Sequence, residues 1–111
     1  MELTTKKFKQ CSLVTVKGRV DSGTAVELDE AFKEITKGGV HKIVLDMSDL
    51  EFMSSAGMRV LILTQKECNR SKGGELVLAS IPQRIQESLQ LVGFNPLFTM
   101  FDDVLTAVGH F

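Results

Sequence analysis

Short apolar runs alternate along this sequence with longer segments in which apolar residues recur every three or four positions, and this alternation constrains the fold most. The runs at residues 13–16, 43–45 and 76–79 have the length and aliphatic composition of buried strands. The segments at about 25–37 and 55–70 have helical spacing, and a Gly-Gly pair closes each one. Strand–helix–strand units pair their strands in parallel through right-handed crossovers, so the pattern predicts an α/β fold.

Further elements are expected at both ends of the chain. Residues 3–9 resemble a polar edge strand that forms a hairpin with the first apolar run. A third helix is expected from Pro82 to Gly93, then a short strand at 97–100 and a short helix at 102–108. We therefore expect one domain over residues 1–111. Its sheet is mixed and mostly parallel, with four to five strands, an antiparallel hairpin at the N-terminal edge and about four helices packed on it.

Charge and composition exclude several classes of protein. Thirteen basic and 14 acidic side chains give a formal net charge of −1, without the basic excess of a nucleic-acid-binding protein. No apolar stretch approaches the ~18 residues of a membrane span, and residues 1–10 lack the apolar centre of a secretory signal. Cys11 and Cys68 form no C-x-x-C pair, which favours free thiols. We expect a cytoplasmic protein whose partners are neither nucleic acids nor membranes.

The residues that most enzymes need are scarce in this chain. His41 and His110 are the only histidines, and neither has a second metal ligand at a suitable spacing. The sequence contains no G-x-S-x-G elbow, no P-loop and no G-x-G-x-x-G fingerprint. Asp46 follows a strand as the phosphoacceptor of a response regulator does, but residues 16–19 lack the acidic cluster that would hold Mg²⁺. The sequence therefore predicts no enzymatic activity, no metal and no cofactor.

Two polar loops, at residues 18–24 and 46–57, are expected at the carboxyl edge of the sheet, and residues 49–51 belong to the second loop. Ser54 and Ser55 stand where this loop enters a helix. One interpretation is a helix cap. The other is a phosphate carrier, because the N–H groups and the dipole of a helix start favour an anion. On the residues alone the two are equally supported.

A glycine and a carboxylate accompany the two serines. Gly57 costs ~1 kcal/mol of helix propensity, and we interpret it as a residue that keeps the backbone approachable. Asp21 is typical of a turn, and the alternative is an acid that lies beside the serine loop. Thr24 and Glu27 have the spacing of a capping box.

Several segments together resemble the STAS domain, which occurs in bacterial anti-sigma factor antagonists. The signature resembles residues 44–50 (VLDMSDL) followed by residues 52–58 (FMSSAGM). Residues 18–21 resemble the first-loop motif of the type Gly-x-Leu-Asp. Residues 73–79 resemble the segment of the fourth strand, and residues 91–94 resemble a C-terminal segment. The resemblance covers nearly the whole chain and implies the STAS fold.

The resemblance implies a role in signalling by partner switching. An unphosphorylated antagonist of this family binds a serine kinase of the GHKL type, which is also an anti-sigma factor, and thereby frees a sigma factor. The kinase phosphorylates the antagonist on a serine at the start of the second helix, and the complex dissociates. A phosphatase of the PP2C type reverses this step. The alternative is a STAS adaptor that is not phosphorylated, in a stressosome-like or lipid-transport complex.

The family's motif, Asp-Ser-x-Gly, places the phosphate acceptor at Ser55. Ser54 replaces the Asp of the motif and is the alternative acceptor. Arg59 and Gln65 are expected on the outer face of the same helix. The resemblance implies a partner-binding surface with these members: Asp21, Ser22, Ser54, Ser55, Gly57, Met58 and Arg59.

Overall fold

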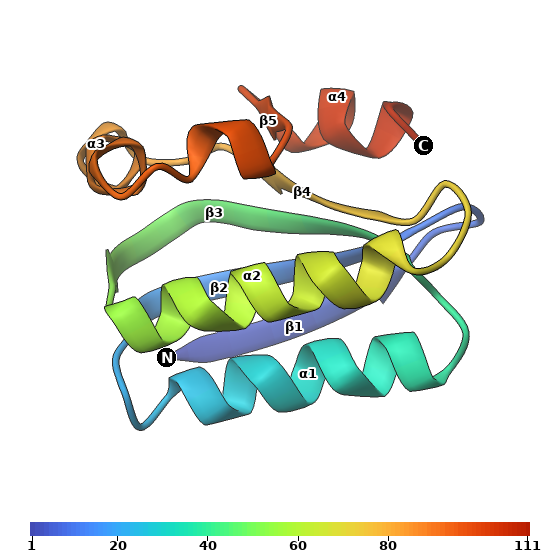
Figure 1. The fold of residues 1–111 in the computed structure, drawn as a ribbon, viewed down its shortest axis with the longest axis horizontal. Helices are drawn as coiled ribbons and strands as arrows, with labels where there is room; N and C mark the ends of the chain where they lie inside the picture. The colour runs from blue at the N-terminus through green and yellow to red at the C-terminus, as the bar shows by residue number, and fades with distance from the viewer.

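The computed structural model describes residues 1–111, and its elements follow the expected order (Figure 1). The strands are β1 (Glu2–Lys7), β2 (Ser12–Val20), β3 (Lys42–Met53), β4 (Glu75–Ala79) and β5 (Met100–Phe101). The helices are α1 (Ala25–Lys37), α2 (Ser55–Asn69), α3 (Gln83–Leu91) and α4 (Val104–Gly109). One sheet contains the strands in the order β1-β2-β3-β4-β5, and only the β1–β2 pair is antiparallel. The predicted mixed, mostly parallel sheet is confirmed.

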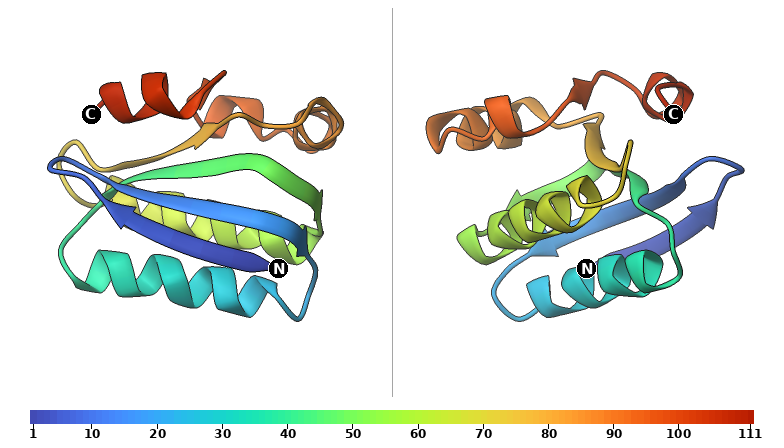
Figure 2. Two further views of the ribbon diagram at one scale, coloured as in Figure 1. Left: turned by 180° about the vertical axis from the view of Figure 1, so that it is seen from behind. Right: turned by 45° about the vertical axis from the view of Figure 1, so that its right-hand side comes forward.

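Helices cover the two faces of the sheet unequally. Leu28 of α1, Leu61 of α2 and Leu89 of α3 belong to one large core against one face. On the other face, Ala107 of α4 packs with a smaller cluster that contains Val44 and Val77. Viewed from behind, β1 and β2 lie in front of α2 (Figure 2). The central strands are therefore buried on both faces, which explains why their apolar runs are continuous.

The third strand is longer than the sequence indicates. Residues 49–51, expected in a loop, belong to β3, which continues to Met53. Leu50 and Met53 are buried in the large core, while Glu51 and Phe52 between them are exposed. Beyond Asp46 the strand pairs with β2 alone, and the pairing contains register shifts. The expected loop is wrong because polar residues also suit a strand that has one neighbour and one open face.

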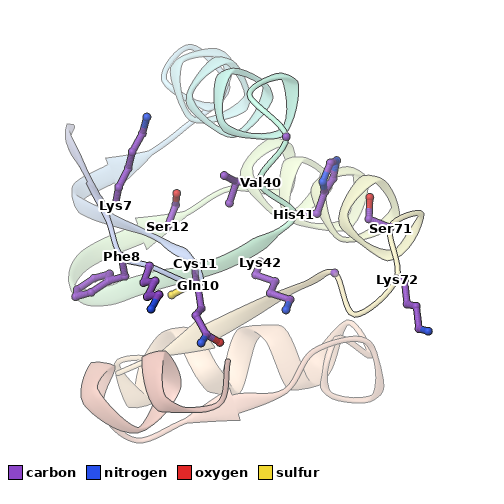
Figure 3. A pocket seen from close by; sticks show the side chains of 13 residues that line it. Lys7, Phe8, Gln10, Cys11, Ser12, Val40, His41, Lys42, Ser71 and Lys72 are labelled. Carbon is purple, nitrogen blue, oxygen red and sulfur yellow. The ribbon is translucent and has the colours of Figure 1, made fainter.

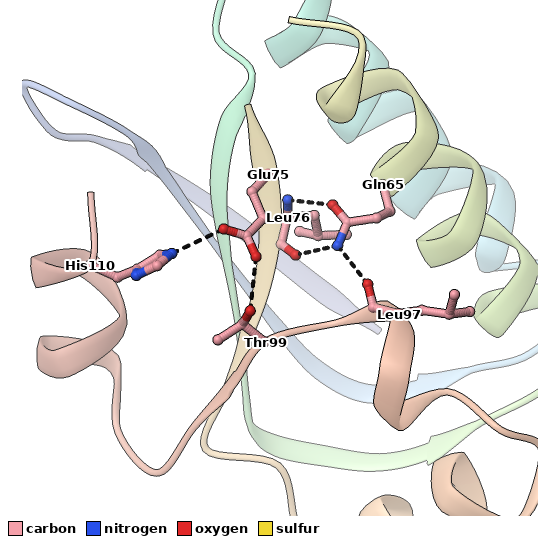
Figure 4. Close-up of polar contacts among 6 residues, drawn as sticks. All are labelled: Gln65, Glu75, Leu76, Leu97, Thr99 and His110. Carbon is pink, nitrogen blue, oxygen red and sulfur yellow. Dashed lines mark hydrogen bonds and ion pairs between the residues drawn. The ribbon is translucent and has the colours of Figure 1, made fainter. Parts of the chain in front are cut away.

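A buried glutamine joins α2 to β4 and to the segment that precedes β5 (Figure 4). The Gln65 amide nitrogen donates to the carbonyl oxygens of Leu76 (3.0 Å) and Leu97 (2.9 Å), and its oxygen accepts from the Leu76 N–H at 2.7 Å. The expected exposure of Gln65 is wrong, because its side chain satisfies buried backbone groups. Residues 95–97 form a 3-10 turn, so the last strand covers residues 100–101 instead of 97–100.

Polar contacts also fix the C-terminal helix. Asp103 caps α4, because its Oδ1 accepts from the Thr106 N–H at 2.7 Å. Near the other end of the helix, His110 Nε2 lies 2.9 Å from Glu75 Oε1, and the Thr99 hydroxyl donates to Glu75 Oε2 at 2.9 Å (Figure 4). The His110–Glu75 contact holds the end of α4 against β4, and the Thr99–Glu75 bond holds the segment before β5 against the same strand.

Both cysteines are buried and neither forms a disulfide, as the sequence predicts. Burial raises the pKa of the Cys11 thiol, and burial together with the nearby Glu67 raises that of Cys68 to about 11. Both thiols are therefore protonated at neutral pH. None of the helices combines the length and the apolar character that crossing a membrane requires.

Candidate functional site

The segments that follow β2 and β3 meet at the carboxyl ends of these strands, although most of the expected second loop, residues 46–53, belongs to β3. The N–H of Ser54 donates to the carbonyl oxygen of Val20 at 2.8 Å. This bond joins the residue before α2 to the last residue of β2. Asp21 and Ser55 are the next residues of the two segments, so the structure brings the predicted acid and the predicted serine to the same edge of the sheet.

Ser54 caps helix α2. Its backbone is extended, with φ −79° and ψ 170°, and its hydroxyl oxygen accepts from the Gly57 N–H at 3.3 Å. Ser55 is the first residue of the helix, and its exposed side chain takes no part in the cap. The two interpretations of the serine pair thus separate: Ser54 supplies the cap, and Ser55 presents a free hydroxyl at the positive end of the helix dipole.

Gly57 permits close packing between α2 and β2. It is buried, and a Cβ atom at this position would lie 2.7 Å from Val20 Cγ1 and 3.0 Å from Met53 Cγ. Contacts between carbon atoms have their optimum at about 3.5–4.0 Å, so any side chain here pushes the helix start away from the strand. The glycine therefore keeps the backbone approachable to Val20, inside the protein, and it is not part of the exposed surface.

Asp21 organises the loop between β2 and α1. Its Oδ1 accepts from the N–H groups of Gly23 (3.0 Å) and Thr24 (2.9 Å), and the Thr24 hydroxyl lies 3.1 Å away. These bonds, those from Thr24 first, lower the pKa of the Asp21 carboxyl below its ordinary value. The expected capping box of Thr24 and Glu27 is wrong: the Thr24 side chain makes no cap bond, since its hydroxyl turns back to the carbonyl of Arg19 at 3.0 Å.

The remaining predicted residues lie around this edge. Ser22 and Arg59 are exposed, and Met58 is half-buried against the large core. Six of the seven residues predicted for the partner-binding surface are therefore accessible to a partner. The exception is Gly57, which is buried.

A small cavity beside the serine pair brings in Arg84, which sequence reasoning missed. The cavity measures about 300 Å³, and Arg19, Phe52, Met58 and Arg84 contribute to its wall. The Arg19 guanidinium stacks on the Phe52 ring at 4.5 Å, and Arg84 Nη2 donates to the carbonyl of Glu51 at 3.1 Å. Arg84 comes from α3, and no local pattern in that helix marks it, because its place depends on how α3 packs near β3. The chain contains no group of three or more His, Cys, Asp or Glu that could hold a metal ion.

Comparisons with known proteins agree on one family. The model of the STAS domain matches residues 2–107. BtrV of Bordetella bronchiseptica, named as a candidate anti-sigma factor antagonist, is 31% identical over 111 residues, which cover 100% of this chain and 95% of BtrV. The anti-sigma-F factor antagonist RsfB of Mycobacterium tuberculosis is 30% identical over 101 residues, which cover 87% of this chain and 80% of RsfB.

Solved structures show the same fold at lower identity. The anti-sigma factor antagonist SpoIIAA of Bacillus, in its unphosphorylated form, superimposes with a TM-score of 0.83 at 16% identity, over 98% of this chain and 95% of SpoIIAA. Its phosphorylated form superimposes with a TM-score of 0.76 at 15% identity, over 98% of each chain.

Proposed function

This chain belongs to the STAS domain family, and on that premise we propose that it is an anti-sigma factor antagonist whose binding is controlled by phosphorylation of Ser55. The unphosphorylated chain binds an anti-sigma factor and so releases a sigma factor. Two relatives named for the anti-sigma factor antagonist role match this chain over at least four fifths of their own length, which supports the assignment.

The observation that carries the proposal is that the two serines have different roles at the start of α2. Ser54 is half-buried and its hydroxyl accepts the cap hydrogen bond, whereas Ser55 is exposed and its hydroxyl makes no cap bond. A kinase can therefore reach the Ser55 hydroxyl without unwinding the helix. Aspartate is as good a cap as serine, so Ser54 fills the structural place of the Asp in the Asp-Ser-x-Gly motif. This favours Ser55 as the phosphate acceptor and Ser54 as the residue that caps the helix on which Ser55 lies.

The phosphorylated state suits this position electrostatically. A phosphate on Ser55 adds a charge of about −1.5 to −2 at a helix start, where the dipole and the free N–H groups favour an anion. Arg59 is exposed and lies four residues further along α2, on the same side of the helix as Ser55. Because the chain itself can accommodate the charge, phosphorylation alters the binding surface without unfolding the domain.

The surface around Ser55 explains why the same charge opposes binding. Ser22 and Ser55 are exposed, neutral residues, and Met58 adds adaptable apolar surface beside them. A partner that buries this patch must strip water from any phosphate on it, and burying a charge is costly unless the partner also supplies hydrogen bonds and opposite charge to it. The kinase is of the GHKL type and transfers phosphate from ATP, a PP2C phosphatase removes it, and this chain performs no catalysis.

Phosphate transfer to the purified chain tests this function. Incubation with the GHKL-type anti-sigma factor kinase of the same organism and ATP should add the mass of one phosphate group to the wild-type chain. The Ser54→Ala chain should gain the same mass, because it keeps Ser55, and the Ser55→Ala chain should gain none. Phosphate uptake by Ser55→Ala would move the acceptor to another residue. No uptake by the wild type would favour the unphosphorylated adaptor.

A further inference from the structure

A second concave site lies at the other edge of the sheet, away from Ser55. The β1–β2 hairpin, the start of β3 and the loop between α2 and β4 surround a pocket of about 500 Å³ (Figure 3). Ser12 and Lys42, the first residues of β2 and β3, belong to its wall. Since Ser55 follows the carboxyl end of β3, the two sites lie at opposite ends of the same parallel strands.

The pocket concentrates positive charge. Four lysines line it, Lys7, Lys9, Lys42 and Lys72, and no Asp or Glu does. None of these lysines takes part in the ion pairs of the chain, which join Lys17, Lys33, Arg70 and His110 to carboxylates. Lys7, Lys42 and Lys72 come from three different segments around the opening (Figure 3). Four uncompensated ammonium groups in a chain of net charge −1 create a local field that attracts anions.

A buried hydroxyl adds a polar group to the same wall. Ser12 lines the pocket and is only 2% exposed, and its hydroxyl makes no hydrogen bond within the chain. No fully enclosed polar side-chain atom of the chain lacks a partner, so this hydroxyl retains its access through the pocket. An accessible hydroxyl of this kind can donate a hydrogen bond to a ligand oxygen that enters the pocket.

The lining also limits the kind of ligand. Only three of the 13 lining residues are hydrophobic, and Phe8, one of these three, lies at the margin of the site (Figure 3). Charged and polar residues thus predominate in the lining, and they offer charge and hydrogen bonds to a ligand. We propose that this pocket binds a compact anion with several phosphate groups, held by the lysines and by the Ser12 hydroxyl.

Titration of the full chain with inorganic triphosphate, followed by calorimetry at low salt, tests the proposal. The double variant Lys42→Glu/Lys72→Glu should bind triphosphate more weakly by on the order of tenfold or more, because two attractive charges become repulsive. The control Lys17→Glu/Lys66→Glu has the same net charge but changes lysines outside the pocket, and it should bind like the wild type. Ser12→Ala should weaken binding while the charge stays unchanged.

Amide chemical shifts of the labelled chain locate the ligand. Triphosphate should move the signals of residues 9–12, 40–42 and 71–74, while those around Ser55 stay in place. The proposal is wrong if triphosphate does not bind, if both double variants lose affinity equally, or if the shifts cluster at the start of α2. Circular dichroism of each variant shows whether it is folded, and a folded Lys42→Glu/Lys72→Glu chain that binds with wild-type affinity also refutes the site.

Discussion

Replacing Gly57 by alanine tests whether the start of α2 is positioned by close contact with β2. In an open helix this change stabilises by ~1 kcal/mol, because alanine is the better helix former. Here the new Cβ would lie 2.7 Å from Val20 Cγ1, and overpacking of this kind costs about 1–3 kcal/mol. The two effects oppose each other, so we expect Gly57→Ala to lower the free energy of unfolding by about 0–2 kcal/mol.

A double-mutant cycle isolates the contact. Val20→Ala removes Cγ1 and leaves Met53 Cγ, a flexible side-chain atom, at 3.0 Å from the new Cβ. In that background Gly57→Ala should be neutral or stabilising by up to ~1 kcal/mol, although Val20→Ala itself destabilises the chain. The predicted coupling energy between the two positions is therefore about 1–3 kcal/mol. Mutations at independent sites are additive to within ~0.5 kcal/mol, so this coupling is measurable.

Urea denaturation followed by far-UV circular dichroism measures this cycle, because the chain has no Trp and no Tyr to report by fluorescence. Stabilisation of the wild-type background by Gly57→Ala would refute the reasoning, as would a coupling near zero. Either result would mean that the helix start moves freely away from the strand, and that Gly57 has some role other than packing.

The remaining predictions concern the cap, an acid and a thiol. Ser54→Ala should destabilise the chain by about 1 kcal/mol in the same urea experiment, whereas Ser54→Asp, which retains a cap, should not. Hydrogen bonds lower the pKa of Asp21 below its ordinary value of 3.8, so their contribution is present at neutral pH and is lost as the pH falls below about 4. Thermal melts between pH 3 and 7 should therefore show a smaller acid-induced loss of stability in Asp21→Ala than in the wild type. Cys68, buried and with a pKa of about 11, should react with a thiol reagent only after unfolding, and rapid labelling of the native chain would contradict its burial.

The sequence predicts the elements whose pattern is local. The continuous apolar runs at residues 43–45 and 76–79 identify strands buried on both faces, and the order of elements then determines a mostly parallel sheet. The prediction fails at residues 49–51, because two exposed residues precede each buried one there and the pattern lacks the alternation typical of a strand. The segment is a strand because it pairs with β2. Gln65 is misjudged for a similar reason, since its partners lie 11 and 32 residues away in the chain.

The candidate site was predictable in its residue types and less so in their roles. Ser54 and Ser55 are adjacent hydroxyls that residue type alone leaves equivalent. The family motif favours Ser55 as the acceptor, and the backbone geometry assigns the cap to Ser54. Gly57 acts through packing against a residue 37 positions earlier, which no motif spacing reveals. Arg84 reaches the site from α3, and the lysine pocket forms from three separate segments that meet only in the folded chain.

The affinity of the organism's anti-sigma factor kinase for variants at the serine pair tests the central claim most directly. Isothermal titration calorimetry should give equal affinities for the wild type and Ser55→Ala, because an exposed neutral side chain is replaced by another. Ser55→Asp should bind at least tenfold more weakly, a loss of about 1.4 kcal/mol, while Ser54→Asp, which places the same charge in the cap, should bind like the wild type. Equal affinity for the wild type and Ser55→Asp would contradict a switch at Ser55.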